Sequence, residues 1–295
     1  MIIDPLSLKL FIAIVEEGTI AAAAEREHIA ASAMSKRISA LEDHFRTTLL
    51  RRTNKGVVPT DAGITLLQLA RGVLHDLNDL HLQLSEYSSG VRGHVRLCAN
   101  ISSINQFLPS EIRSFMELHP HVQVHLEENV SEAIMKAVAD NAADVGIVAI
   151  GSYRHDLEYF PYHFDQLTVI TPKEHPLAQK RSVSFRDTLD FDFVGLTVGS
   201  ALHNQILRAA NELDRTLKLR IQVKSFDALC LMVEAGLGIG IVPKGVAKPY
   251  VKGLRIRSLT LAESWAKREL KICIRSFDAL PAAARLLVEH LRNKE

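Results

Sequence analysis

Small hydroxyl and basic side chains occupy one face of a predicted helix near the N-terminus. Within residues 31–45, apolar side chains recur at intervals of four, three and four, at Met34, Ile38, Leu41 and Phe45. This spacing predicts one buried stripe along a helix. The opposite face carries groups that can contact phosphates and base edges in a DNA groove. We predict that it contacts DNA through Ser32, Ser35, Lys36, Arg37 and Ser39.

The residues before this helix favour a helix-turn-helix motif over an isolated amphipathic helix. An apolar stripe within residues 10–15 predicts a first helix that packs beneath the reading helix. Gly18 suits the left-handed end of that helix, and Thr19 can cap the alanine-rich helix of residues 20–27. Small side chains let two helices pack closely across a short turn. These elements would place the reading helix in a major groove.

A basic segment follows the reading helix and predicts a wing. Residues 26–60 hold seven Lys or Arg against three Asp or Glu, whereas residues 1–25 hold one Lys against four acids. The net charge of the whole chain, +1, hides this asymmetry. Lys55-Gly56 predicts the tip of a β-turn. We expect the wing to hold the DNA backbone or minor groove through Arg51, Arg52 and Lys55.

Residues 61–90 predict a long linker helix with a heptad seam. Thr60 and Asp61 offer a cap and a favourable first-turn charge. A single helix cannot bury such a seam alone, so it packs either on the chain's own larger domain or on a second copy. We favour the second copy, and a two-fold dimer implies a pseudo-palindromic operator in double-stranded DNA. The predicted dimerisation residues are Leu66, Ala70, Val73, Leu77, Leu80 and Leu84.

Residues 94–295 alternate between predicted strands and helices, which indicates an α/β architecture with largely parallel pairing. Short apolar strands are expected near residues 95–99, 122–126, 144–148, 191–196, 219–223, 239–243 and 270–274. Ser102 or Ser103 is expected to cap a single helix running from Ile104 to Phe115. The serine- and glycine-rich residues 88–93 predict a hinge before this region.

The chain resembles the LysR-type transcriptional regulators over essentially its whole length. The resemblance rests on Ala23-Ala24, Ala33-Met34-Ser35-Lys36, Leu41-Glu42, Arg52-Thr53, Pro59-Thr60-Asp61-Ala62-Gly63, and the segments 172–178 and 235–243. One departure is Ala30-Ala31, where the family usually has Ser-Gln and the glutamine commonly touches a base. This departure leaves more of the sequence readout to the remaining polar side chains and to DNA shape.

The resemblance implies the domain organisation and the site. It implies a winged helix-turn-helix over residues 1–60, a linker helix over 61–90, and an effector-binding domain over 91–295. That domain would have two Rossmann-like lobes similar to periplasmic binding proteins, residues 91–163 with 268–295 and residues 164–267, with a ligand cleft between them. Each implied serine could equally be a plain helix cap. The implied effector contacts are Asn100, Ser102, Ser103, Asn129, Ser131, Ala149, Thr197, Ser200, Ser225 and Phe226.

Several other patterns carry no chemistry in this interpretation. The glycines of residues 236–240 follow a predicted helix and enter a strand, the reverse of a dinucleotide loop. His121 and His125 would lie roughly 13 Å apart along a strand, too far to share a metal ion. Cys98, Cys230 and Cys273 fit buried reduced thiols, with Cys230 the first candidate for a redox sensor. We therefore predict no metal, no cofactor and no enzymatic activity.

The predicted function is a cytoplasmic, sequence-specific transcriptional regulator controlled by a small-molecule effector. The sequence contains no recognisable signal peptide and no apolar run long enough for a membrane span. The expected partners are operator DNA, a small-molecule effector, further copies of the chain in a homodimer or homotetramer, and RNA polymerase if the protein activates transcription. A carboxylate is one candidate class for the effector. The alternatives are a two-lobed binding protein or enzyme with an incidental N-terminal domain, and an architectural DNA-binding protein without an effector.

Overall fold

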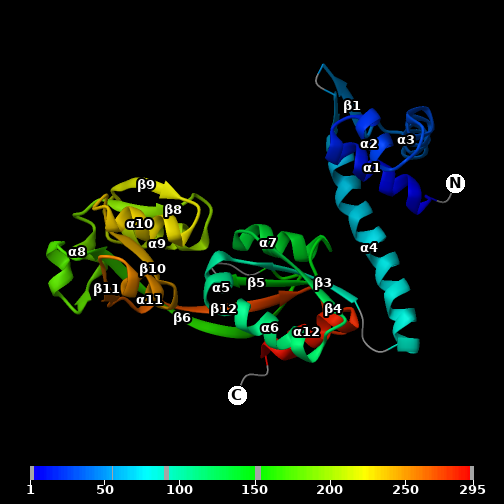
Figure 1. Ribbon diagram of the computed structural model, residues 1–295. Helices are drawn as coiled ribbons and strands as arrows, with labels where there is room; N and C mark the ends of the chain where they lie inside the picture. The colour runs from blue at the N-terminus through cyan, green and yellow to red at the C-terminus, as the bar shows by residue number, and fades with distance from the viewer. Residues whose placement is uncertain (1–2, 55, 90–92, 150–153, 293–295) are drawn as a thin grey trace. The chain divides into compact units, whose positions relative to one another are not determined.

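The computed structural model describes residues 3–54, 56–89, 93–149 and 154–292, without the side chains of residues 75, 78, 79 and 81–89. The chain divides into two compact units. The first holds residues 1–93 with residues 140–142, and the second holds the remainder. Figure 1 shows a helical N-terminal part and a larger α/β part.

The first unit is a winged helix-turn-helix followed by a long helix. Its elements are α1 (Pro5–Glu17), α2 (Ile20–Arg26), α3 (Ala31–Phe45), β1 (Leu50–Thr53), β2 (Gly56–Pro59) and α4 (Asp61–Ser89). Gly18 ends α1 in the left-handed conformation, at φ 71°. The Thr19 hydroxyl caps α2 by accepting a hydrogen bond from the backbone N–H of Ala22 at 3.1 Å. Both predicted caps are confirmed.

The core of this unit lies between α1, α2 and α3. Met34, Ile38 and Leu41 of α3 are buried against Phe11 and Ile14 of α1, as the helical stripe predicts. The prediction was wrong at the last position of the stripe, because Phe45 is 39% exposed. The helix ends at Phe45, and the following Arg46 turns the chain with φ 51°. The stripe therefore leaves the core one turn earlier than the spacing indicated.

The second unit begins with three strands and their connecting helices. The elements are β3 (Gly93–Ala99), α5 (Ile101–Gln106), α6 (Leu108–Leu118), β4 (Val122–Glu128), α7 (Ser131–Ala139) and β5 (Val145–Ala149). The long strand β6 (Glu158–Pro172) follows, then η1 (Pro176–Gln179), β7 (Ser182–Val183), α8 (Phe185–Thr188), β8 (Phe193–Leu196), α9 (Ala201–Glu212) and β9 (Leu219–Val223). The last elements are α10 (Phe226–Glu234), β10 (Gly240–Pro243), α11 (Lys244–Gly253), β11 (Ile256–Leu261), η2 (Ser264–Ala266), β12 (Lys267–Ile274) and α12 (Ala282–Arg292).

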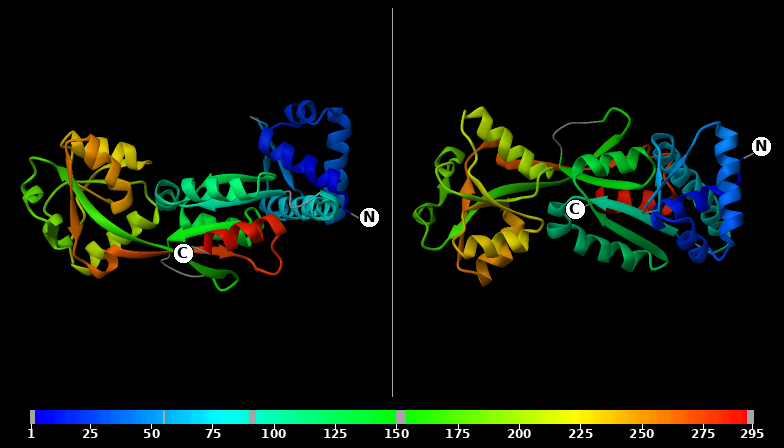
Figure 2. Two further views of the ribbon diagram at one scale, coloured as in Figure 1. Left: turned by 60° about the horizontal axis from the view of Figure 1, so that its bottom comes forward. Right: turned by 90° about the horizontal axis from the view of Figure 1, so that it is seen from above.

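Two lobes of this unit share the strands β6 and β12. The sheet runs in the order β4-β3-β5-β12-β6-β11-β7, with β10 also paired to β6. In the first lobe Phe160 and Tyr162 of β6 pack on a core with Val95, Ile147 and α12. In the second lobe Leu167, Val169 and Ile170 of the same strand lie in a separate core with α10 and α11. Figures 1 and 2 show β6 and β12 passing from one lobe into the other.

The expected parallel pairing is wrong for these crossing strands. β3 with β5, β8 with β9, and β7 with β11 pair in parallel. β12 runs antiparallel to both β5 and β6, and β6 runs antiparallel to β10 and β11. The reason is that β6 and β12 enter their sheets from the opposite lobe, whereas parallel pairing reflects local strand-helix-strand crossovers.

The helix expected from Ile104 to Phe115 is two helices. α5 ends at Gln106 and α6 begins at Leu108, with Phe107 between them at φ −123°. Pro109 lacks the N–H that a continuous helix would need, which explains the break. The cap was also assigned wrongly, because Asn100 Oδ1, not a serine, accepts from the backbone N–H of Ser103 at 2.9 Å. No helix among the described residues is long and apolar enough to cross a membrane.

Candidate nucleic-acid interface and ligand pocket

The outer face of α3 carries the predicted DNA-reading side chains. Ser32, Lys36 and Ser39 are exposed, whereas Ser35 is half-buried. Arg37 lies on the flank of the helix and is 43% exposed. Its Nη1 donates to Asp4 Oδ2 at 3.1 Å and to Ser7 Oγ at 3.2 Å. The contacts of all five residues with DNA remain predictions.

The wing is a two-stranded antiparallel hairpin held to the helices at both strands. Glu42 of α3 accepts from the backbone N–H groups of Leu49 and Leu50 at 2.8 and 3.1 Å. On the other strand, the Val57 N–H donates to the Gly18 carbonyl at 2.7 Å. Gly56 is required there, because a Cβ would lie 2.3 Å from the same carbonyl oxygen. Glu42 belongs to the Leu41-Glu42 motif of the sequence, but its role in holding the wing was not predicted.

Two of the three predicted DNA contacts of the wing lie on its first strand. Arg51 and Arg52 are exposed on β1, opposite Val58 and Val57 of β2. Lys55 lies outside the described residues. The contacts of Arg51 and Arg52 with the DNA backbone remain predictions.

The predicted dimerisation seam of α4 divides into two parts. Ala70 is 1% exposed, and Leu66 packs on the core of the helix-turn-helix, so these two positions are used within the chain. Further along the helix, Val73, Leu77 and Leu80 are 46%, 42% and 57% exposed. The side chain of Leu84 lies outside the described residues. The exposed part of the seam is the part that a second copy could cover.

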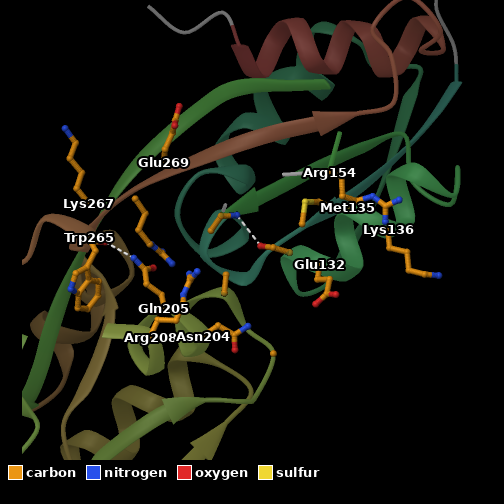
Figure 3. A pocket seen from close by; sticks show the side chains of 15 residues that line it. Glu132, Met135, Lys136, Arg154, Asn204, Gln205, Arg208, Trp265, Lys267 and Glu269 are labelled. Atoms are coloured by element: carbon orange, nitrogen blue, oxygen red, sulfur yellow. Dashed lines mark hydrogen bonds between the residues drawn. The ribbon is translucent and has the colours of Figure 1, made fainter. Parts of the chain in front are cut away.

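A pocket of about 840 Å³ lies between the two lobes of the second unit. Its first-lobe wall comes from α7 and the end of β5, and its second-lobe wall comes from α9. Figure 3 shows Asn204, Gln205 and Arg208 on one side and Glu132, Met135 and Lys136 on the other. The complete lining is Ser131, Glu132, Met135, Lys136, Ala149, Arg154, Gly199, Ala201, Asn204, Gln205, Arg208, Trp265, Lys267, Arg268 and Glu269.

The lining favours negative charge. It contains five cationic side chains and two carboxylates. Ser131 begins α7, and Gly199 and Ala201 flank the start of α9, so two helix N-termini meet the same pocket. The free N–H groups and the dipole of a helix N-terminus attract anions. The pocket can therefore bind an anionic group without a metal ion.

The cations differ in how they are already engaged. Arg268 is buried and donates to Asp165 through Nε at 2.7 Å and through Nη2, which also donates to Ser102 Oγ at 3.2 Å. Arg154 pairs with Asp156 at 2.8 Å. Among the described residues, no carboxylate pairs with Arg208, which is exposed on α9. Arg208 is thus a lining cation that can bind a ligand, as is Lys267, whose Nζ lies over the Phe164 ring at 5.2 Å from its centroid.

Trp265 forms a rigid aromatic part of the lining. Its carbonyl accepts a hydrogen bond from Gln205 Nε2 at 2.7 Å, and its ring lies edge-on to Phe185 at 5.3 Å between centroids. It is the single tryptophan of the chain. A ligand in this pocket would therefore lie beside a natural fluorophore.

The effector positions implied by the resemblance fall into two groups. Ser131 and Ala149 line the pocket, where the Ala149 N–H donates to Ser131 Oγ at 3.2 Å. The remaining positions are not in its lining. In the first lobe, Asn100, Ser102 and Ser103 lie at the start of α5, and the Asn129 side chain donates a hydrogen bond to Glu127. In the second lobe, Thr197 follows β8, Ser200 and Ser225 cap α9 and α10, and Phe226 is buried in the core. Their roles as effector contacts remain predictions.

Sequence reasoning missed the side chains that α9 contributes. Asn204, Gln205 and Arg208 lie on the face of α9 opposite buried Leu202, Ile206 and Ala209. The three-to-four spacing of these apolar residues after Ser200 was the available signal for a helix. Arg208 could then have been placed on the polar face of this helix.

The three cysteines are buried and carry perturbed thiols. Burial raises the pKa of Cys98 and raises the pKa values of Cys230 and Cys273 to about 12. A neighbouring carboxylate, Asp227, adds to the effect at Cys230. Since the thiolate is the reactive form, these environments favour inert thiols, including at Cys230.

A winged helix-turn-helix joined to a two-lobed α/β unit with an interlobe pocket defines a ligand-responsive DNA-binding regulator. The profile described as "Bacterial regulatory helix-turn-helix protein, lysR family" matches residues 6–64, and "LysR substrate binding domain" matches residues 88–295. The chain belongs to the LysR family. It is a sequence-specific transcriptional regulator whose DNA binding is modulated by a small-molecule effector.

Relatives have names of the same kind, and solved structures share the fold. An uncharacterized HTH-type regulator YbhD of Escherichia coli is 29% identical over 95% of this chain and 88% of its own. CysL of Bacillus subtilis is 25% identical over 98% and 93%. The fold matches CbnR complexed with its target DNA at a TM-score of 0.75, with 20% identity over 98% and 99% of the two chains. The effector-binding domain of QuiR with shikimate matches at 0.61, with 19% identity over 68% and 96%.

Proposed function

We propose that an anionic effector of the carboxylate class binds in the pocket between the lobes and controls how a dimer of this chain binds a pseudo-palindromic operator. The observation that carries this proposal is the meeting of Arg208 and two helix N-termini in one pocket. Shikimate, the ligand of the QuiR domain, is itself a carboxylate. A ligand that touches both α7 and α9 binds one lobe arrangement more tightly than others, which is the requirement for a population shift.

The exposed apolar side chains of α4 support the dimer. A second copy placed across a two-fold axis would cover Val73, Leu77 and Leu80 and present two reading helices to two half-sites. Assembly of two such dimers gives the homotetramer. We further propose that the protein acts in the cytoplasm, binds its effector without turnover, and contacts RNA polymerase where it activates transcription.

The fluorescence of Trp265 tests the effector class directly. The full-length protein is titrated with carboxylates such as succinate, benzoate and shikimate, each beside its neutral amide. We expect fluorescence changes with one or more carboxylates and not with the amides. Arg208→Ala should weaken the responding carboxylate by about 10- to 100-fold, since a hydrogen bond to a charged group contributes about 1.5–3 kcal/mol.

The control variant removes a cation outside the pocket. Lys248 is exposed on α11, and Lys248→Ala should leave carboxylate binding unchanged. The responding carboxylate should also shift the affinity for a duplex that the wild-type protein selects from random sequence. Equal responses to the neutral amides, or equal affinities of the Arg208→Ala and wild-type proteins, would overturn the proposal.

A further inference from the structure

Arg37 of the reading helix is attached to the N-cap of α1. Asp4 is that N-cap, and its Oδ1 accepts the backbone N–H of Ser7 at 2.9 Å. The Ser7 hydroxyl donates to Asp4 Oδ2 at 2.7 Å. The same two oxygens, Asp4 Oδ2 and Ser7 Oγ, receive hydrogen bonds from Arg37 Nη1 at 3.1 and 3.2 Å. The Arg37 guanidinium, 33 positions from Asp4 in the sequence, thus bonds to an N-cap of α1 that Asp4 and Ser7 already form without it.

Stability alone does not account for this attachment. The side chains of Arg37 and Asp4 are 43% and 50% exposed, and exposed ion pairs contribute little to the stability of the fold. The cap of α1 is formed by Asp4 and Ser7 without Arg37. The α3 helix is independently held by its buried stripe of Met34, Ile38 and Leu41. What the pair does fix is the direction of a long cationic side chain.

The attached guanidinium keeps donors for another partner. Arginine has five N–H donors, and both hydrogen bonds described above leave from Nη1. The Nε and Nη2 groups can still donate to a phosphate. A free arginine side chain loses rotamer entropy when it is ordered, and DNA binding would otherwise have to overcome that loss. An arginine that is ordered before binding forms the same phosphate contact at a lower entropic cost.

We propose that Asp4 and Ser7 are positioning residues for DNA binding, which orient Arg37 so that it contacts a DNA phosphate beside the major groove. A carboxylate oxygen of Asp4 and the hydroxyl oxygen of Ser7 therefore strengthen the binding of the protein to DNA, a polyanion. The inference goes beyond the assignment of α3 as the reading helix, and it does not depend on the effector or on the pocket. It predicts an effect opposite in sign to simple electrostatics.

The test compares two acid-to-amide variants of the full-length protein. Asp4→Asn keeps an N-cap side chain, because Asn caps helices as well as Asp, but it removes the charge that holds Arg37. Asp43→Asn removes the same charge from an exposed site on α3. Electrostatics alone would make both variants bind DNA more tightly. Positioning predicts that Asp4→Asn binds about tenfold more weakly, a change of about 1.4 kcal/mol, while Asp43→Asn binds at least as tightly as the wild type.

Salt dependence and a double-mutant cycle separate positioning from a structural role. Affinities are measured between about 50 and 200 mM salt on a duplex selected by the wild-type protein. Loss of one phosphate contact should flatten the salt slope by about one unit in Asp4→Asn and in Arg37→Gln. The combined variant should bind no more weakly than Arg37→Gln alone, since both changes remove one contact.

Further readouts keep the proposal falsifiable. Ser7→Ala removes one of the two hydrogen bonds to Arg37 and should weaken binding less than Asp4→Asn. Thermal unfolding of each variant shows whether the domain is intact, and Ser7→Ala carries the test if Asp4→Asn unfolds. Tighter binding by Asp4→Asn, additive losses in the cycle, or an unchanged salt slope would each overturn the proposal.

Discussion

The buried ion pair between Asp165 and Arg268 should be among the most sensitive points of the second unit. The two residues face each other across β6 and β12, the strands that the lobes share. Their side chains are 1% and 5% exposed, and Gln106 Nε2 donates to the same carboxylate at 3.3 Å. In Asp165→Asn, an amide NH₂ group replaces one of the two carboxylate oxygens. Oδ1 accepts a hydrogen bond from Arg268, and Oδ2 accepts from both Arg268 and Gln106, so either replacement removes an acceptor. The arginine charge then remains buried without a counter-charge.

The expected loss can be derived from the burial of the pair. Removing one partner of a buried ion pair costs about 3–5 kcal/mol, because the other charge loses its compensation. We expect the lower end, about 3 kcal/mol, since the remaining amide oxygen and Ser102 still accept from Arg268. With a urea slope of about 2 kcal/mol per molar, the unfolding midpoint should fall by about 1.5 M.

Trp265 and a matched surface variant make this measurable. The indole lies three residues before Arg268, so its fluorescence reports unfolding of this region in the full-length protein. Asp190→Asn is the control, because Asp190 pairs with Arg215 at 2.6 Å but is 69% exposed. It should change stability by less than about 1 kcal/mol. A loss of that size in Asp165→Asn as well would refute the reasoning that burial makes this pair costly to break.

Two further outcomes follow from the buried thiols and from α4. Because the folded pKa values of Cys230 and Cys273 are raised to about 12, at pH 8 only about one native thiol in ten thousand is ionised, against about one in ten in the unfolded chain. A thiol-reactive dye should therefore label these cysteines in urea and not in the native protein, and rapid labelling of the native protein would contradict this. Their contribution to stability should decline as the pH rises above about 9, where the unfolded thiols ionise. Leu77→Glu should dissociate the proposed dimer, as measured by light scattering, since a two-fold interface loses two buried leucines, worth about 3–6 kcal/mol. Val198→Glu, a change on an exposed loop, should leave the dimer intact. An intact Leu77→Glu dimer would exclude this face of α4 as the dimer interface.

Periodicity predicted the elements that bury one regular face. The stripe of α3 and the alternating strand β9 follow directly from it, because an isolated amphipathic element already specifies which side is inside. The break at Phe107 and the exposure of Phe45 depend on where a helix stops. Pro109 and Arg46 decide those ends; the proline could have been recognised in the sequence, whereas the left-handed conformation of Arg46 is visible only in the backbone.

The pocket was harder to predict than the fold, because it joins residues 131–136, 199–208 and 265–269. Serines at predicted helix starts were natural candidates, yet Ser200 and Ser225 each accept from an N–H three residues later and serve as caps. The same hydroxyl satisfies either role, so residue type cannot distinguish them. Arg208, for which the described residues provide no acidic partner, lies in the middle of α9 rather than in a turn.

The attachment of the wing sets a limit on how this regulator can respond to its effector. Glu42 joins the reading helix to β1, and the Gly18 carbonyl joins the end of α1 to β2. With both strands held, these hydrogen bonds oppose a change in the distance between the predicted major-groove contact and the predicted flanking backbone contact. In the proposed dimer, we therefore expect a signal from the effector to change the separation or the angle between the two half-sites. In a footprint, each half-site should keep its width, and only the DNA between the half-sites should change its protection.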